Sequence, residues 1–266
     1  MSSVLIGLTA CGLYLLASGV AARQLKSQAE PRRSGFLGLG LVAWLFHLLA
    51  LWPLLVRDQG LYLGLLPMAS LIGAVGTALV VLSNLYRRLE WLSLLVFPFN
   101  ALMLPLALLL DTGYQPQPMA HGLGSHVLFS VLAFAVLAIA ASHCVLLLIQ
   151  HRQLKHGHIR GMMRVLPPIQ VMETMLFELI WAGVILLALA VASGFLFVDN
   201  LFAQHIAHKT VFTLLSLLLF ITLLAGRHWL GWRGVVAVRL TITGFALLLL
   251  GFFGSQLVLE VILKRP

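Results

Sequence analysis

The stretch "GSHVLFSVLAFAVLAIAASHCVLLLI", residues 124–149, has no Lys, Arg, Asp or Glu and is long enough to cross a bilayer as a helix. Similar apolar stretches recur along the whole chain of 266 residues, of which 61% are hydrophobic and only 9% are charged. Soluble domains carry about 25% charged residues, so most of this chain does not face water. The sequence predicts an all-α integral membrane protein, a bundle of eight transmembrane helices.

The other apolar stretches define the remaining spans. We expect one membrane domain over residues 1–266, with spans near 3–22, 36–56, 64–85, 92–110, 124–149, 171–196, 208–226 and 235–259. The connections between these spans are short, and no segment is long enough for a soluble domain. Any function therefore lies within the membrane or at its two surfaces.

The basic residues indicate which way the chain crosses the membrane. Only Arg57, Lys209, Lys264 and Arg265 lie on one side, so 13 of the 17 Lys and Arg residues fall on the other, in loops 23–35, 86–91, 150–170 and 227–234 or just inside the last span. Cytoplasmic loops carry such an excess, so we expect both termini to be extracytoplasmic and the first span to remain uncleaved. The net charge of +9 reflects this bias, which makes membrane lipid the expected partner and excludes nucleic acid.

The two cysteines give no sign of a disulfide framework or a metal site. Cys11 and Cys144 both lie inside apolar runs, and the chain has no Cys-x-x-Cys pair. It also lacks the Cys-x-x-Cys-His motif, so we expect no covalently attached haem. No metal ion is expected; zinc at His205 and His208 is the weaker possibility, because no Cys or well-placed second carboxylate completes a ligand set.

Four histidines fall at the predicted outer ends of two spans. His121 and His126 stand at the start of the fifth span, and His205 and His208 at the start of the seventh. Both spans start outside, so the topology puts these imidazoles in one layer. Neutral imidazole is a good ligand for haem iron. We expect His126 to be a haem ligand with His208 as its partner, while the alternative is that interfacial histidines are tolerated as amphipathic side chains.

Two further histidines lie within or beside the membrane. His47 is near the middle of the second span, where an ionisable group is costly unless it is hydrogen-bonded or ligates something. Both a ligand role and a packing hydrogen bond are open for it. His228 ends the seventh span on the cytoplasmic side, next to Trp229. It is a candidate cofactor ligand or a neighbour of the helix C-terminus.

Two glutamates of the sixth span also need an explanation. Glu178 lies at a depth similar to that of His143, so the two form either a structural hydrogen bond or part of a proton relay. Glu173 falls in the first turn of the same span, where a carboxylate suits the helix dipole. We expect Glu173 to be architectural, paired with Arg164 or Arg239.

An ordered series of motifs resembles the cytochrome c assembly family. These motifs are "GSHVLFSVLAFAVLAIAA", "LPPIQVMETMLF", "HKTVFTLLSLLLF", "GRHWLGWRG" and "GFALLLLGFFGS". The family comprises haem-handling inner-membrane proteins of the CcsA, CcmC and CcmF types, and the closest likeness is to the small eight-span branch called YpjD or HemX-like. The resemblance covers about residues 121–256 and is weaker before them.

The resemblance implies haem ligands at particular positions. His126 matches the first outward-facing haem-ligand histidine of the family, and His228 approximately matches a histidine that ligates a membrane-embedded haem. Two family features are missing. The WxWD stretch is replaced by "VDNLFAQHIAHKT", and the end of the chain, "FGSQLVLEVILKRP", has no second outward histidine.

These observations predict a haem-binding protein of the bacterial inner membrane that assists cytochrome c assembly. It would be neither a synthase nor another enzyme, and it would hold haem non-covalently through residues among His126, His208, His228 and His47. The alternative is a non-haem accessory or scaffold subunit of another integral membrane protein, such as a transporter. A transporter in its own right is a third hypothesis, based on "FPFNALMLP", residues 97–105, which we expect to interrupt a helix.

Overall fold

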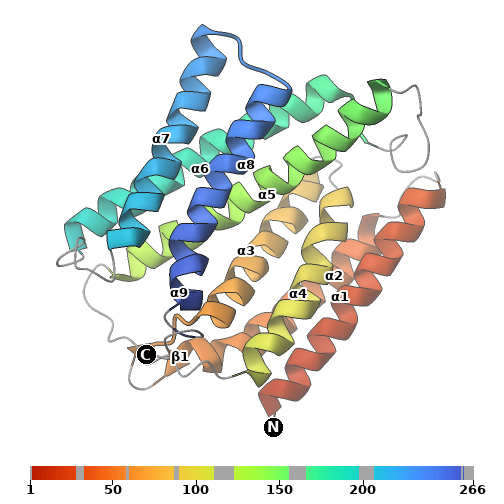
Figure 1. Ribbon diagram of the computed structural model, residues 1–266. Coiled ribbons are helices and arrows are strands. Elements are labelled where there is room, and N and C mark those ends of the chain that lie inside the picture. Colours follow the sequence, from red (N-terminus) through yellow and green to blue (C-terminus); the bar gives the residue numbers. More distant parts are fainter. Residues whose placement is uncertain are drawn as a thin grey trace. The chain divides into compact units, whose positions relative to one another are not determined.

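Almost all of the described chain is helical (Figure 1). The computed structural model describes residues 2–27, 33–57, 60–86, 90–110, 123–155, 166–197, 207–258 and 260. Its elements in chain order are α1 (Ser2–Ser27), α2 (Arg33–Leu55), β1 (Val56–Arg57), β2 (Gly60–Leu61), α3 (Leu65–Tyr86), α4 (Glu90–Leu109), α5 (Leu123–Lys155), α6 (Ile169–Phe197), α7 (Ala207–Trp229), α8 (Val235–Leu249), the π-helix η2 (Leu250–Gly254) and α9 (Ser255–Leu257).

Eight of these helical segments are long and apolar enough to cross a membrane, which confirms the predicted fold class. Their ends agree with the predicted spans to within a few residues; the seventh runs over His208–Trp229 and the eighth over Val235–Leu257. The expected interruption of the fourth span is wrong, because α4 is one helix that contains Pro98 and Pro105. Proline removes one backbone donor without ending a helix whose surroundings hold it.

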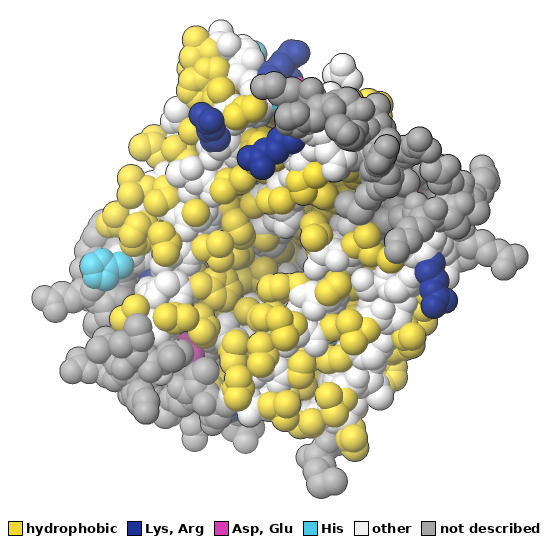
Figure 2. All heavy atoms as spheres, turned by 45° about the vertical axis from the view of Figure 1, so that its right-hand side comes forward, with side chains coloured by type: hydrophobic (Ala, Val, Ile, Leu, Met, Phe, Trp, Pro, Cys, Tyr) yellow, Lys and Arg dark blue, Asp and Glu magenta, His cyan; other side chains and the backbone are white. Residues whose placement is uncertain are grey.

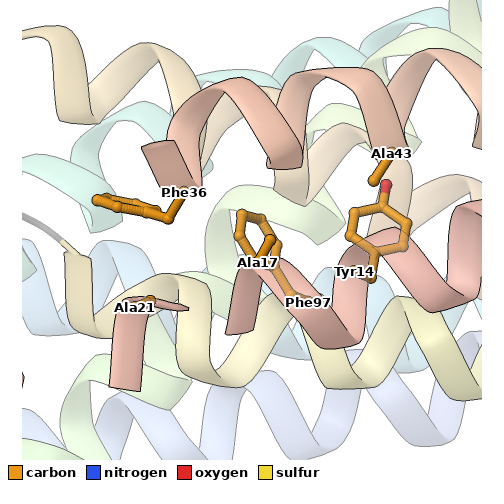
Figure 3. Packing of buried hydrophobic residues seen from close by; sticks show 6 residues of the cluster. All are labelled: Tyr14, Ala17, Ala21, Phe36, Ala43 and Phe97. Atoms are coloured by element: carbon orange, nitrogen blue, oxygen red, sulfur yellow. The ribbon is translucent and has the colours of Figure 1, made fainter. Parts of the chain in front are cut away.

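The chain divides into two compact units, and each is described by itself. The first unit consists mainly of α1 to α4 and the antiparallel pair β1–β2, in which Val56 faces Leu61. Its core contains a cluster of fully buried side chains on α1, α2 and α4, namely Tyr14, Ala17, Ala21, Phe36, Ala43 and Phe97 (Figure 3). The small residues let the helices approach, while the rings of Tyr14 and Phe97 pack with centroids 5.6 Å apart.

A buried polar network also joins the helices of the first unit. His47 on α2 contacts the Tyr14 hydroxyl of α1 at 3.2 Å and the Ser70 hydroxyl of α3 at 2.9 Å. Further along α3, the Asn100 amide of α4 donates to the Gly73 carbonyl at 3.0 Å and to the Thr77 hydroxyl at 2.6 Å. Side-chain hydrogen bonds between spans contribute to helix association in lipid, where apolar surfaces give little preference for one neighbour.

The second unit contains α5 to α9. Helices α5 and α6 form its most extensive contact, and Gly183 leaves room for the Leu137 side chain, since a Cβ there would collide with it. At the other end of the unit from the start of α5, the turn between α7 and α8 is closed by Gly231 and Gly234, both with positive φ. Glycine adopts this conformation without strain.

The surface matches a membrane environment. Figure 2 shows hydrophobic side chains over most of the visible face, with the few Lys and Arg side chains toward its edge. Large apolar side chains such as Leu49, Trp181 and Leu218 are more than half exposed on α2, α6 and α7. Exposed leucine, isoleucine and tryptophan on the helices are what a lipid-facing surface requires.

Candidate functional site

The imidazole of His126 is held in a notch on α6, formed by Ala190, Ser193 and Gly194. His126 lies in the first turn of α5, and its Nδ1 is 2.8 Å from the backbone oxygen of Ala190 on α6. Ser193 donates to the same oxygen at 2.9 Å and lies 3.4 Å from Nδ1. Gly194 completes the notch, because a Cβ at that position would stand 3.1 Å from Cε1 and 3.2 Å from Nδ1 of the ring.

This contact determines which ring nitrogen carries the proton. A backbone carbonyl only accepts hydrogen bonds, so Nδ1 must be the donor to Ala190. In the neutral ring, Nε2 then holds the lone pair. Metal-ligating histidines show the same arrangement, in which the second ring N–H donates to a carbonyl and so sets the tautomer and the ring orientation. The donor chemistry of His126 therefore fits a haem-iron ligand through Nε2.

His208 lies at the same end of the second unit as His126. Figure 1 shows that α5 and α7 begin at one end of this unit, where α6 ends. Contacts between side chains also place the start of α7 close to α5. The ring of Phe252 in η2 lies 6.4 Å from the ring of Phe134 on α5 and 5.6 Å from the Lys209 ammonium on α7. We call this region the His126 end. His208 is exposed there, in the first turn of α7.

Aromatic side chains from α8 and η2 surround Phe134 near the His126 end. The ring of Phe134 makes edge contacts with the rings of Phe245 and Phe253, both at 5.3 Å. The π-helix brings Phe252 and Phe253 together at 5.0 Å, one after the other on the same segment. Single π-helical turns occur frequently at functional sites. Here the turn supplies an apolar wall about two helical turns deeper along α5 than His126.

His228 belongs to the opposite end of the second unit. It is exposed near the end of α7, beside the ring of Trp229, which is 79% exposed. Twenty residues of helix separate it from His208, which corresponds to about 30 Å. His228 and His208 therefore cannot ligate one haem, so the predicted ligands divide between different sites.

His47 lies in the first unit and has both ring nitrogens engaged. Nδ1 contacts the Tyr14 hydroxyl and Nε2 contacts the Ser70 hydroxyl, and the side chain has no exposed surface. Ligation of a metal would require one of these contacts to be broken. The geometry favours the packing hydrogen bond over the ligand role for this histidine.

Polar side chains of α5 and α6 make hydrogen bonds to backbone groups that the sequence did not indicate. His143 of α5 donates from Nε2 to the Met172 carbonyl at 2.8 Å, and Glu178 is exposed on α6. Glu173 accepts the backbone N–H of Gly234 at 2.9 Å, at the start of α8. This carboxylate is architectural, as expected, but it satisfies the N-terminus of a different helix.

The candidate ligands His121 and His205, and Arg164 as a candidate partner of Glu173, lie outside the described residues. Within the described ranges, no three His, Cys, Asp or Glu side chains come together as metal ligands. The sequence did not single out Ala190, Ser193 or Gly194. The small residues near the end of the sixth span were the available signal, but small residues also serve ordinary helix packing.

The chain is similar over most of its length to proteins of one family. The sequence model described as "Cytochrome C assembly protein" matches residues 38–263. The "Inner membrane protein YpjD" of Escherichia coli (strain K12) is 30% identical over 227 residues, which cover 84% of this chain and 85% of that protein. An "Uncharacterized 28.8 kDa protein in nifR3-like 5'region" of Azospirillum brasilense is 27% identical over 98% of each chain. No solved structure matches this chain.

Proposed function

The chain belongs to the cytochrome c assembly protein family, and from this premise we propose that it binds haem non-covalently and handles it without being a synthase. It is a multi-pass inner membrane protein, in keeping with its eight spans and with the name of its relative YpjD. We propose that it holds haem for cytochrome c assembly and makes or breaks no covalent bonds itself. Bound haem would supply an iron centre that histidine nitrogens can ligate.

The tautomer of His126 carries this proposal. The notch of Ala190, Ser193 and Gly194 fixes the imidazole on α6 and leaves Nε2 as the basic nitrogen. An interfacial histidine that is merely tolerated needs no such fixed orientation. His208 is the candidate second ligand because it stands at the same end of the unit and is exposed. His228 and His47 lie elsewhere and are not part of this proposed site.

The test is the absorption spectrum of protein purified from haem-replete cells. We expect a Soret band in the wild type that is lost in His126→Ala. His151→Ala is the matched control, because His151 is an exposed histidine at the other end of α5. A further variant, His126→Gly, should regain the band when imidazole is added, because free imidazole can fill the space and ligate the iron.

Two results would contradict the haem proposal. One is colourless wild-type protein at full yield; the other is an unchanged spectrum in His126→Ala. Colourless protein that co-purifies with a second membrane protein in equal amount would support the accessory-subunit alternative instead.

A further inference from the structure

The turn between α7 and α8 carries an excess of positive charge (Figure 1). Residues 200–259, which include both helices, contain no Asp or Glu. The end of α7, the turn and the first part of α8 contain three arginines, Arg227, Arg233 and Arg239. The neighbouring helix α6 contributes two carboxylates, Glu173 and Glu178, and Glu173 already accepts the Gly234 N–H. The arginines therefore outnumber the carboxylates here.

The Arg227 guanidinium is held against α6 but lacks a hydrogen-bond acceptor. It lies 4.6 Å from the centre of the Phe177 ring, and Phe177 is 7% exposed. The Nη1 atom of Arg227 is buried and has no hydrogen-bond partner in the part of the chain that the structure describes. An aromatic face attracts a cation but does not satisfy the donors in the plane of the guanidinium. Arg227 is half-buried, so an acceptor from outside the protein can reach the exposed part of the side chain.

The backbone of the turn brings Arg233 close to Arg227. The Gly226 oxygen accepts the N–H groups of Leu230 at 2.9 Å and of Trp232 at 3.1 Å. Arg227 follows Gly226 and Arg233 follows Trp232, so the two arginines begin at neighbouring points of the backbone. Gly226 leaves room for the Trp232 ring, since a Cβ there would collide with it. Arg233 is exposed, and its guanidinium is available beside that of Arg227.

Exposed apolar side chains indicate that this turn lies at the membrane surface. Trp229, the last residue of the seventh span, is 79% exposed, and Leu230 is 68% exposed. Tryptophan is enriched where the hydrocarbon of a bilayer meets the headgroups. A ligand at this turn therefore meets arginines on one side and apolar side chains on the other. An anionic phospholipid, with its charged phosphate and its acyl chains, has the matching composition.

We propose that the α7–α8 turn binds the phosphate of an anionic phospholipid, such as phosphatidylglycerol, through Arg227 and Arg233, with Trp229 and Leu230 against the acyl chains. The planar fork of a guanidinium suits phosphate, which it binds through parallel hydrogen bonds. A zwitterionic lipid carries its phosphate beside a cation of its own, so the arginines favour lipids with a net negative charge. This site lies at the opposite end of the second unit from His126 and does not depend on haem.

The experiment measures the thermal midpoint of the purified protein in detergent by circular dichroism as lipid is added. A ligand that binds only the folded state raises this midpoint. We expect saturating phosphatidylglycerol to raise it by about 5 °C and phosphatidylcholine to change it by less than about 1 °C. Inorganic phosphate, compared with chloride at the same ionic strength, should have no effect, because it lacks the chains that Trp229 and Leu230 contact.

Three variants locate the effect. Arg227→Gln should lose most of the rise caused by phosphatidylglycerol, and Arg233→Gln should lose part of it. Arg23→Gln is the matched control, because it removes the same charge from an exposed arginine on α1, in the first unit. This variant should keep the full rise.

Several outcomes would refute the lipid site. Equal rises with phosphatidylglycerol and phosphatidylcholine would do so, as would a rise with inorganic phosphate as large as that with phosphatidylglycerol, which would indicate a site for soluble anions. A rise that persists in both Arg227→Gln and Arg233→Gln would exclude the turn, and an equal loss in all three variants would indicate an effect of total charge. Arg233 is exposed outside the helices, so Arg233→Gln tests the site even if Arg227→Gln does not fold.

Discussion

The contacts of a single histidine, His126, fix the orientation of its ring in the second unit. Most of the contacts that hold His126 come from backbone or from small side chains, so its chemistry is set by position and not by a charged neighbour. Groups that hold a metal-ligating histidine in place typically change metal affinity by about 10–100-fold when they are altered. Gly194 is a neighbour of the His126 ring that mutation can enlarge.

Gly194→Ala should weaken haem binding without unfolding the protein. The new methyl group would stand 3.1–3.2 Å from the His126 ring, so the imidazole must move by a few tenths of an ångström. We expect a loss of affinity of about tenfold in a haem titration. Gly124→Ala is the control, because a Cβ at Gly124 meets nothing within 4 Å on the same first turn of α5. Equal affinities of the two variants would show that the notch does not position the ring.

At this scale the sequence indicated His126 as a candidate ligand but not the groups that hold it. His126 was found from its place at the start of an apolar run and from the family resemblance. Its partner is a backbone oxygen, and every residue has one, so no letter of the sequence marks Ala190. Glu173 likewise accepts a backbone N–H, that of Gly234, while Arg164, one of its two expected partners, lies outside the described residues.

Among the elements, the π-helix η2 packs against α7 where α8 ends. Its two glycines, Gly251 and Gly254, differ in how closely other side chains approach them. A Cβ at Gly251 would lie 2.9 Å from the Phe212 Cβ of α7, whereas a Cβ at Gly254 would meet only the Leu250 side chain, at 3.6 and 3.9 Å. The first glycine is therefore required for close packing, and the second is not.

Gly251→Ala should lower the thermal midpoint of the purified protein, while Gly254→Ala should leave it unchanged or raise it. Overpacking typically costs about 1–3 kcal/mol, whereas alanine in an open helical position is favoured over glycine by about 1 kcal/mol. Unfolding in detergent, followed by circular dichroism, measures both. A midpoint for Gly251→Ala at or above that of the wild type would mean that α7 does not pack closely here.

Helix ends were predictable from the sequence, but the interior of the helices was not. Spans follow from the exclusion of charge from lipid, which the sequence displays directly. The π-helical turn and the continuity of α4 through Pro98 depend on which neighbours satisfy the backbone. The prolines of α4 therefore suggested a break in a helix that is continuous, and no residue indicated the π-helical turn of η2.

In the whole molecule, successive loops lie on opposite sides of the membrane, and an even number of spans puts both chain ends on the same side. The structure confirms eight spans, and the distribution of basic residues predicts which side each loop occupies. Which helices pair is not visible in the sequence, because lipid-facing and helix-facing surfaces are equally apolar. The extensive α5–α6 contact became apparent only from the structure.

Reporter fusions test the predicted orientation. Alkaline phosphatase should be active when fused after Gly60 or at the C-terminus and inactive after Arg88, because the loop that contains Arg88 is predicted to be cytoplasmic. Green fluorescent protein at the same three positions should show the reverse pattern and serves as the control for expression. Phosphatase activity after Arg88 would place His126 on the cytoplasmic side.

The bond between Tyr14 and His47 has a consequence for how the chain is made. Synthesis proceeds from the N-terminus, so α1 is complete before α2 leaves the ribosome, and α3 follows later. An imidazole that enters lipid alone is costly. Because Tyr14 belongs to the preceding span, His47 can enter the membrane with a hydrogen-bond partner already present. Ser70 can bond to the second ring nitrogen only later, when α3 has been inserted.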